Sequence, residues 1–343
     1  MSSGFHPCYN GRDESMTGEN MDQTKLKMLI QAAKMYYQED YNQQEIANRL
    51  GVSRPTVSRL LQQAKEEGIV RIEIVDPSLR LDQLAAALKE RYRMKKVLIV
   101  PVHNYDEKTV KKMLGRQAAL YLDQIVADGD LIGVAWGTTL YQVALHLKHK
   151  PVNHVHVVQL KGGVSYSAEH TYASEIMQRF GQAYGTIPHY LPLPAIVDKA
   201  VVKEAIEADK HIQKLLEMGK QANIAVYTVG EALSDSLLFR LGYLNEEELK
   251  LLSAKAVGDI CSRFYDENGK ICDERLNQRT IGIELDELRK KEHSVLVAGG
   301  LNKVKAIRGA LRGRYANVLI TDQYTAQLLH EQSGGDDDSG HSD

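Results

Sequence analysis

Three short segments of the chain combine glycine with lysine or threonine in a way that suits binding of a small anion. In each segment glycine lets the backbone come close to a ligand, and free N–H groups, hydroxyls or an ammonium group can bind phosphate oxygens. Taken singly, each also fits an ordinary helix cap or a solvated lysine. Because all three follow apolar runs, we expect one sugar-phosphate site, with the candidate residues Gly137, Thr138, Thr139, Lys161, Gly162, Gly163 and Lys303.

Two further polar residues are candidates for the same site. Arg240 is a cation flanked by apolar residues, which indicates partial burial and leaves a structural salt bridge as the alternative role. Asp259 suits acceptance of hydrogen bonds from sugar hydroxyls, or it caps a turn. The histidines between residues 146 and 156 have no cysteine or carboxylate partners nearby, so we expect neither a metal site nor a cofactor.

The candidate residues follow six short apolar runs that alternate with helical patterns. Such runs are typical of a parallel sheet covered by helices on both faces. In open α/β sheets ligands bind at the carboxyl ends of the strands. The sequence therefore predicts a doubly wound, mainly parallel α/β domain with the site at one sheet edge, built on the runs at 97–102, 130–136, 154–160, 222–230, 293–300 and 315–322.

A second kind of element lies near the N-terminus, in residues 41–70. Gly51 ends one helical pattern and Ser53 can cap the next, with a tight turn between them. This spacing predicts a helix-turn-helix, which we expect to continue into a short β wing at 69–75. The second helix would present to duplex DNA the residues Ser53, Arg54, Thr56, Ser58 and Arg59.

Local charge supports a DNA-binding role for this segment. Residues 46–65 carry four cations and no acid, although the whole chain has a net charge of −2. Arginine can bind guanine through two hydrogen bonds, and hydroxyls suit phosphates. The alternative is an amphipathic helical hairpin with a solvated basic face. Helix-turn-helix proteins that read pseudo-palindromic sites usually dimerise, so a homo-oligomer is expected.

Size and composition bound the remaining possibilities. The chain has 343 residues, of which 43% are hydrophobic and 26% charged, as in ordinary globular proteins. It has no apolar run long enough to span a membrane and no secretory signal, so we expect a cytoplasmic protein without a membrane partner. The domain boundaries that we expect are 1–20 disordered, 21–75 DNA-binding, 76–94 connector with a helix at 81–92, 95–332 ligand-binding and 333–343 a disordered acidic tail.

The whole series of motifs resembles the SorC family of sugar-responsive bacterial regulators, and within it the deoxyribonucleoside regulators of bacilli. The likeness extends over roughly residues 22–329. It is carried by YNQQEIANRLGVSRPTVSRLL, VAWGTT, VVQLKGG, YLPLP, LLFRLGY, AVGDICSRFYDENG and VAGGLNKVKAI. The resemblance implies a dimeric or tetrameric repressor of a catabolic operon that is induced by a phosphorylated sugar, deoxyribose 5-phosphate. It also implies that the effector is bound by Gly137, Thr138, Thr139, Arg240, Asp259 and Lys303.

The implied effector gives Lys161 a more specific possible role. Deoxyribose 5-phosphate has an aldehyde in its open-chain form, and a desolvated lysine can condense with it to a Schiff base. Hydrogen bonding by the ammonium group is the alternative. The ligand domain also resembles sugar-phosphate isomerases and deaminases. We nevertheless expect no enzyme activity, because no carboxylate or histidine base accompanies the KGG loop. An enzyme of that class, or an activator built from the same modules, remains the rival hypothesis.

Overall fold

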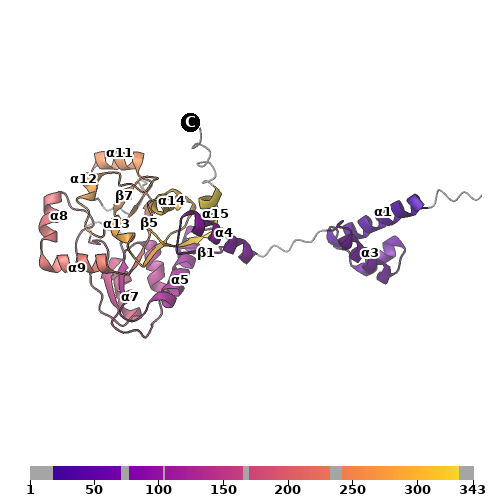
Figure 1. Ribbon diagram of the computed structural model, residues 1–343, viewed down its shortest axis with the longest axis horizontal. Coiled ribbons are helices and arrows are strands. Elements are labelled where there is room, and N and C mark those ends of the chain that lie inside the picture. The colour runs from indigo at the N-terminus through magenta and orange to yellow at the C-terminus, as the bar shows by residue number, and fades with distance from the viewer. Residues whose placement is uncertain (1–17, 71–76, 103–104, 165–169, 232–241, 332–343) are drawn as a thin grey trace, which may run out of the picture. The chain divides into compact units, whose positions relative to one another are not determined.

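The computed structural model describes residues 18–70, 77–102, 105–164, 170–231 and 242–331. Arg240, one of the predicted effector residues, lies outside these ranges. The chain divides into two compact units, Met1–Asp76 and Pro77–Asp343, and each is described here by itself (Figure 1).

The described residues of unit 1 form three helices, which include the predicted helix-turn-helix. Its helices pack around a small core that includes Leu29, Ile46, Val57 and Leu61, all of which are buried. The helices are α1 (Gly18–Tyr37), α2 (Gln43–Leu50) and α3 (Arg54–Glu66).

The turn between α2 and α3 has the chemistry that the sequence predicts. Gly51 adopts a left-handed conformation with φ 66° and ends α2. Ser53 is the N-cap of α3, and its Oγ accepts a hydrogen bond from the backbone N–H of Thr56 at 3.3 Å. A second cap precedes α2, where Asn42 and Glu45 form a reciprocal capping box. Both motif helices therefore begin at positions fixed by side-chain caps.

Two expected helix starts differ from those observed, and the expected β wing lies mostly outside the described residues. Helix α1 begins at Gly18 rather than at Met21, since the residues between them do not break a helix. Residues 69 and 70, at the start of the expected β wing, form a bend, and the rest of that segment is outside the described residues. Helix α4 (Pro77–Arg91) begins before residue 81, because proline is well tolerated in the first turn of a helix.

Unit 2 is built on a six-stranded, entirely parallel sheet, and all six predicted runs form its strands. The sheet order is β1-β9-β8-β4-β2-β3. Strands β4 and β9 are buried at every position, which explains their continuous apolar runs. The strands are β1 (Lys96–Val100), β2 (Leu131–Val134), β3 (His156–Gln159), β4 (Ile224–Tyr227), β8 (His293–Val297) and β9 (Val318–Asp322).

Helices cover this sheet on both sides. In Figure 1, α5 and α7 lie on one side of the sheet, and α14 and α15 lie on the other. Helix α5 also packs against α6, while α4 packs against β1 and α15. The helices that follow the strands are α5 (Glu107–Ile125), α6 (Thr138–His146), α7 (Ala173–Ala183), α8 (Ala200–Glu207), α9 (Lys210–Gln221), α14 (Val304–Arg312) and α15 (Gln323–Glu331).

A small antiparallel sheet, which the sequence did not predict, stands beside the main one. Its order is β5-β6-β7, and a two-residue turn joins β6 to β7. Both turn residues are left-handed, Cys261 with φ 51° and Ser262 with φ 68°, a conformation that costs energy in residues other than glycine. The segment contains β5 (Val229–Glu231), α11 (Glu246–Lys255), β6 (Gly258–Ile260), β7 (Arg263–Tyr265), α12 (Glu274–Asn277) and α13 (Leu285–Leu288).

The strand order places a topological switch point between β2 and β4. From β2 the chain continues to β3 on one side, and it then returns to β4 on the other side of β2. The connections after β2 and β4 therefore leave the sheet in opposite directions and open a crevice at their carboxyl ends. Ligands of open α/β sheets bind in such crevices.

Candidate functional site

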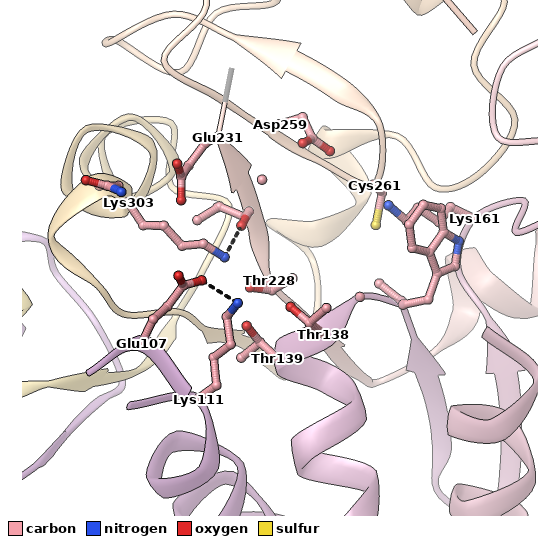
Figure 2. Close-up of a pocket in the computed structure, with 16 residues that line it drawn as sticks. Glu107, Lys111, Thr138, Thr139, Lys161, Thr228, Glu231, Asp259, Cys261 and Lys303 are labelled. Carbon is pink, nitrogen blue, oxygen red and sulfur yellow. Dashed lines mark hydrogen bonds and ion pairs between the residues drawn. The ribbon is translucent and has the colours of Figure 1, made fainter. Parts of the chain in front are cut away.

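A cavity of about 310 Å³ lies at this switch point. Its walls come from the segments that follow β2, β3, β4 and β8, from β5 and β6, and from the first turns of α5. The volume is at the lower end of the range for small-molecule sites, which suits a single small metabolite. Figure 2 shows its polar side chains converging from these elements.

The loop after β2 leads directly into the start of α6. Gly137 is the N-cap of that helix, with φ 137°, and no side chain caps it. The first N–H groups of α6 are therefore not bound by a capping side chain, and the helix dipole adds positive potential there. Thr138 and Thr139 both line the cavity. A simple threonine cap, the alternative reading of this segment, is not what is observed.

Lys161 lies on the opposite side of the cavity and is almost completely buried. Its side chain packs over the ring of Trp136, with Nζ 3.5 Å from the ring centre. The residue is 6% exposed, so the alternative of a solvated lysine does not hold. Burial lowers the pKa of Lys161, and the neighbouring Asp259 opposes this effect. Lys161 thus has a stronger tendency to be a neutral amine than an ordinary lysine.

The two glycines after Lys161 shape the backbone and are not among the residues that line the cavity. A Cβ on Gly162 would lie 2.2 Å from the carbonyl oxygen of Pro194. The carbonyl of Gly162 accepts a hydrogen bond of 2.7 Å from Nε1 of Trp136. Glycine at this position therefore lets the loop hold the tryptophan ring under Lys161.

Asp259 is a buried carboxyl group on β6. It accepts a hydrogen bond of 2.9 Å from the backbone N–H of Ser262 in the strained turn. Burial raises the pKa of Asp259, while Lys161 and then that hydrogen bond oppose the rise. Cys261 also lines the cavity, and burial raises the pKa of its thiol to about 11. Burial thus favours the neutral carboxyl group of Asp259 and the neutral thiol of Cys261 on this side of the cavity.

Lys303 approaches from the loop after β8. Its Nζ donates a hydrogen bond of 3.0 Å to the carbonyl of Val229. Burial lowers the pKa of Lys303, and the nearby Lys111 lowers it further. The loop is held by Asp322, which accepts from the N–H of Gly300 at 2.9 Å, and by the hydroxyl of Tyr105, which accepts from the N–H of Leu301 at 2.8 Å.

Several residues of this cavity were not predicted from the sequence. Lys111 and Glu107 come from the first turns of α5 and form an ion pair, drawn as a dashed line in Figure 2. Thr228 follows β4, and its Oγ1 is buried without a hydrogen-bond partner among the described residues. Glu231, on β5, also lines the cavity. The only signal in the sequence for Lys111 and Glu107 was their i,i+4 spacing, which is common on solvated helices.

The predicted DNA-contacting residues lie at the start of α3. Most are exposed and Thr56 is half-buried, and the hydroxyls of Ser53 and Thr56 lie 2.8 Å apart. The buried face of α3 is apolar and belongs to the core of unit 1. The exposed residues are Ser53, Arg54, Ser58 and Arg59.

The described residues also bear on metal binding and membrane insertion. No group of three or more histidine, cysteine, aspartate or glutamate residues is arranged to hold a metal ion. None of the described helices combines the length and the apolar character that crossing a membrane requires.

Comparisons with known proteins assign both units to families. Residues 76–330 match a putative sugar-binding domain, and residues 28–85 match a Crp-like helix-turn-helix domain. The chain is 53% identical to the deoxyribonucleoside regulator of Bacillus subtilis, over 90% of this chain and 99% of that protein. It is 31% identical to the sorbitol operon regulator of Klebsiella pneumoniae, over 91% and 99%.

Solved structures agree with these matches. The crystal structure of the full-length sorbitol operon regulator SorC from Klebsiella pneumoniae covers 89% of this chain, with a TM-score of 0.69 and 30% identity. That comparison includes 99% of the other chain. A transcriptional regulator from Streptococcus pneumoniae matches 76% of this chain, and all of its own, with a TM-score of 0.71 and 27% identity.

Proposed function

Because this chain belongs to the SorC family of sugar-binding transcriptional regulators, we propose that it represses an operon for deoxyribonucleoside or deoxyribose catabolism. In this proposal deoxyribose 5-phosphate fills the cavity of unit 2 and releases the protein from its operator. The similarity to the deoxyribonucleoside regulator of Bacillus subtilis supports this choice of pathway. The observation that carries the proposal is a cavity with an anion site at one end and a buried lysine at the other.

The phosphate group would bind at the start of α6. The N–H groups and hydroxyls of Thr138 and Thr139 can donate to its oxygens, and Lys303 supplies a positive charge from the loop after β8. Gly137 leaves room for the approach because it has no side chain. Asp259 suits acceptance of a hydrogen bond from a sugar hydroxyl. This arrangement favours a sugar phosphate over a free sugar.

The open-chain aldehyde would reach Lys161. Nζ of a neutral Lys161 attacks the aldehyde carbon, and the carbinolamine then loses its hydroxyl group as water, which forms a C=N bond. Asp259, whose pKa is raised by burial, can supply the proton that the departing hydroxyl needs. One aldehyde and one amine thus give one imine and one water. A hydrogen bond from a charged Lys161 to the sugar is the alternative.

Unit 1 would bind double-stranded operator DNA through α3. Arg54 and Arg59 are exposed and carry positive charge near the start of that helix, where major-groove readers contact bases and phosphates. Pseudo-palindromic operators are read by paired motifs, so we propose that the protein acts as a homo-oligomer, a dimer or a tetramer, in the cytoplasm. The protein is a regulator rather than an enzyme. The relatives that it matches over nearly their whole length are also regulators.

A band-shift experiment at fixed salt concentration tests the proposal. The purified protein is mixed with duplex DNA from upstream of its own transcription unit, and deoxyribose 5-phosphate, ribose 5-phosphate, glucosamine 6-phosphate and free deoxyribose are added in turn. Salt is held constant because phosphate contacts make affinity for DNA strongly salt-dependent. We expect release by deoxyribose 5-phosphate at the lowest concentration. Retention of the complex with every compound, or tighter binding as for an activator, would contradict the proposal.

A further inference from the structure

We propose that Glu107 is the anion that occupies the cavity when no effector is bound, where it pairs with Lys111. The phosphate of the effector then replaces Glu107 as the partner of Lys111, which becomes a second phosphate-binding cation. This inference rests on the proposed function, because it concerns how the same cavity accepts a phosphorylated ligand. Neither residue belongs to the three glycine-containing segments. Both line the cavity.

The two residues are placed by the start of α5. Asp106 is the N-cap, and its side chain accepts hydrogen bonds from the backbone N–H groups of Lys108 and Thr109. This cap fixes the first turn, so Glu107 and Lys111 project from one helical face, one turn apart. Nζ of Lys111 lies 2.5 Å from Oε1 of Glu107. Figure 2 shows this pair below Lys303 and to the left of Thr139, at the end of the cavity where we propose that the phosphate binds.

The burial of the two partners is unequal. The side chain of Lys111 is 23% exposed, whereas that of Glu107 is 70% exposed. A carboxylate so accessible to water is screened and binds its partner weakly, as exposed i,i+4 pairs generally do. Glu107 can therefore turn to solvent at little cost. Lys111 has less access to water, and it would need a replacement anion.

Lys303 shows the same need for an anion. Its ammonium donates to the carbonyl of Val229, and no carboxylate lies within 4.0 Å of it among the residues that the structure describes. Burial lowers the pKa of Lys303, and the positive charge of Lys111 lowers it further, whereas Glu231 opposes the change. Glu107 interacts with both, since Lys111 first and Lys303 after it lower the pKa of its carboxyl.

A phosphate is better matched to this pair of cations than Glu107 is. It carries up to two negative charges and three terminal oxygens, so it can bind both ammonium groups and the start of α6 together. A carboxylate on α5 has one charge and binds Lys111. The exchange predicts selectivity for phosphorylated sugars, because a sugar without a phosphate has no group that can displace Glu107.

The two roles open to Glu107 predict opposite effects of its removal. If Glu107 competes with the ligand, Glu107→Gln should strengthen phosphate binding. If Glu107 only orients Lys111 for the ligand, the same change should weaken it. Glutamine keeps the size of the side chain, and the residue is exposed, so the fold should tolerate the substitution.

Fluorescence of Trp136 provides a direct readout of the cavity. This residue is the single tryptophan of the chain, and its ring lies against Lys161. We would titrate full-length protein with inorganic phosphate and, separately, with deoxyribose 5-phosphate. For Glu107→Gln we expect the Kd of both ligands to fall by about twofold to fivefold, the modest gain expected when the ion pair that the ligand displaces is exposed. For Lys111→Met we expect it to rise by at least about tenfold.

Matched controls separate this local effect from a change in overall charge. Asp123→Asn and Lys112→Met remove the same charges from exposed positions on α5 outside the cavity, and both should leave the Kd unchanged. In the double variant Glu107→Gln with Lys111→Met, the gain from the first change should disappear. Circular dichroism would check that each variant is folded.

The outcomes distinguish the inference from the proposed function. If Glu107→Gln leaves phosphate affinity unchanged or weakens it, Glu107 does not occupy the phosphate site in the effector-free protein. If deoxyribose 5-phosphate still releases the operator in the same experiment, the proposed regulatory function stands. If no sugar phosphate releases the operator but Glu107→Gln still strengthens binding of inorganic phosphate, the replacement of Glu107 by phosphate is supported. The proposal that a sugar phosphate is the effector is then wrong. Lys111→Met with wild-type affinity would also overturn the inference.

Discussion

At the scale of single residues, Lys161 differs most from an ordinary member of its type. It is buried against an aromatic ring and has no carboxylate within 4.0 Å among the described residues, although Asp259 is near enough to affect its pKa. Burial disfavours the charged form of an isolated amine. The side chain is therefore suited to act as a nucleophile toward an aldehyde as well as a hydrogen-bond donor.

We predict that borohydride traps deoxyribose 5-phosphate on Lys161. The reduced adduct is a stable secondary amine, so mass spectrometry of proteolytic fragments should locate it. Because the neutral amine is the reactive form, trapping should increase with pH through the pKa of Lys161. That pKa is below the usual 10.5, so the increase should be complete at lower pH than for a surface lysine.

Lys161→Arg provides the control for this prediction, because it keeps the charge but cannot form an imine. We expect no adduct in this variant and weaker release of the operator by deoxyribose 5-phosphate. If the wild-type protein binds the sugar phosphate and gives no adduct at any pH, Lys161 acts through hydrogen bonding alone.

The residues of the site that could be predicted from the sequence belong to the glycine-containing segments that follow apolar runs. Thr138 and Lys161 lie next to a glycine, and Lys303 lies three residues after Gly300, so the pattern identified them. Lys111 and Thr228 have no such marker. Lys111 reaches the cavity only because α5 packs beside the carboxyl ends of strands distant in the chain.

At the scale of elements, the loop that carries Lys303 depends on Asp322 at the end of β9. Its two oxygens accept hydrogen bonds from the N–H groups of Gly300, Tyr324 and Thr325 and from the hydroxyl of Thr325. Asp322 is fully buried, and a Cβ on Gly299 would lie 2.3 Å from Oδ2. The carboxylate thus joins the start of α15 to the loop of Lys303.

We predict that Asp322→Asn loosens this loop. An amide turns one acceptor into a donor, and a hydrogen bond to a buried charged group is worth about 1.5–3 kcal/mol. Thermal unfolding should show a loss of that order, and titration with inorganic phosphate should show weaker binding because Lys303 is no longer held. Asp286→Asn, which breaks an exposed pair, should change neither. Unaltered phosphate affinity in Asp322→Asn would show that the loop needs no such support.

The main sheet could be predicted from the sequence, and the small sheet could not. Strands that are buried at most positions produce continuous apolar runs, and the chain shows one for each of the six strands. Strands β5, β6 and β7 have three residues each, too few for an alternating pattern to be detected. The turn at Cys261-Ser262 also lacks the glycine or asparagine that usually marks it.

At the scale of the whole molecule, α4 is the element of unit 2 that follows unit 1 in the chain. It packs against β1 and α15, and Nη1 of Arg91 donates to the carbonyl of His330 at 2.7 Å. Helix α15 in turn begins beside Asp322, which holds the loop of Lys303. A continuous series of contacts therefore runs from the cavity to α4.

We predict that the two activities can be separated by substitution. Arg59→Ala removes an exposed cation from α3, and a lost base contact costs about 1–3 kcal/mol of operator affinity. It should leave binding of deoxyribose 5-phosphate unchanged. Thr138→Ala should have the reverse effect and raise only the sugar-phosphate concentration needed for release. Band shifts and fluorescence titrations measure the two activities, and damage to both by both changes would contradict the division.

The same two sites must also be coupled in both directions if the sugar phosphate releases the operator. An effector can shift the DNA-binding equilibrium only by the ratio of its affinities for the two states. Linkage then requires operator DNA to weaken sugar-phosphate binding by the same factor by which the sugar phosphate weakens operator binding. We predict that the Kd of deoxyribose 5-phosphate, measured through Trp136, rises by this factor when saturating operator is present. Scrambled duplex at equal concentration should have a smaller effect. An unchanged Kd, together with operator release in the band shift, would mean that release does not arise from binding in this cavity.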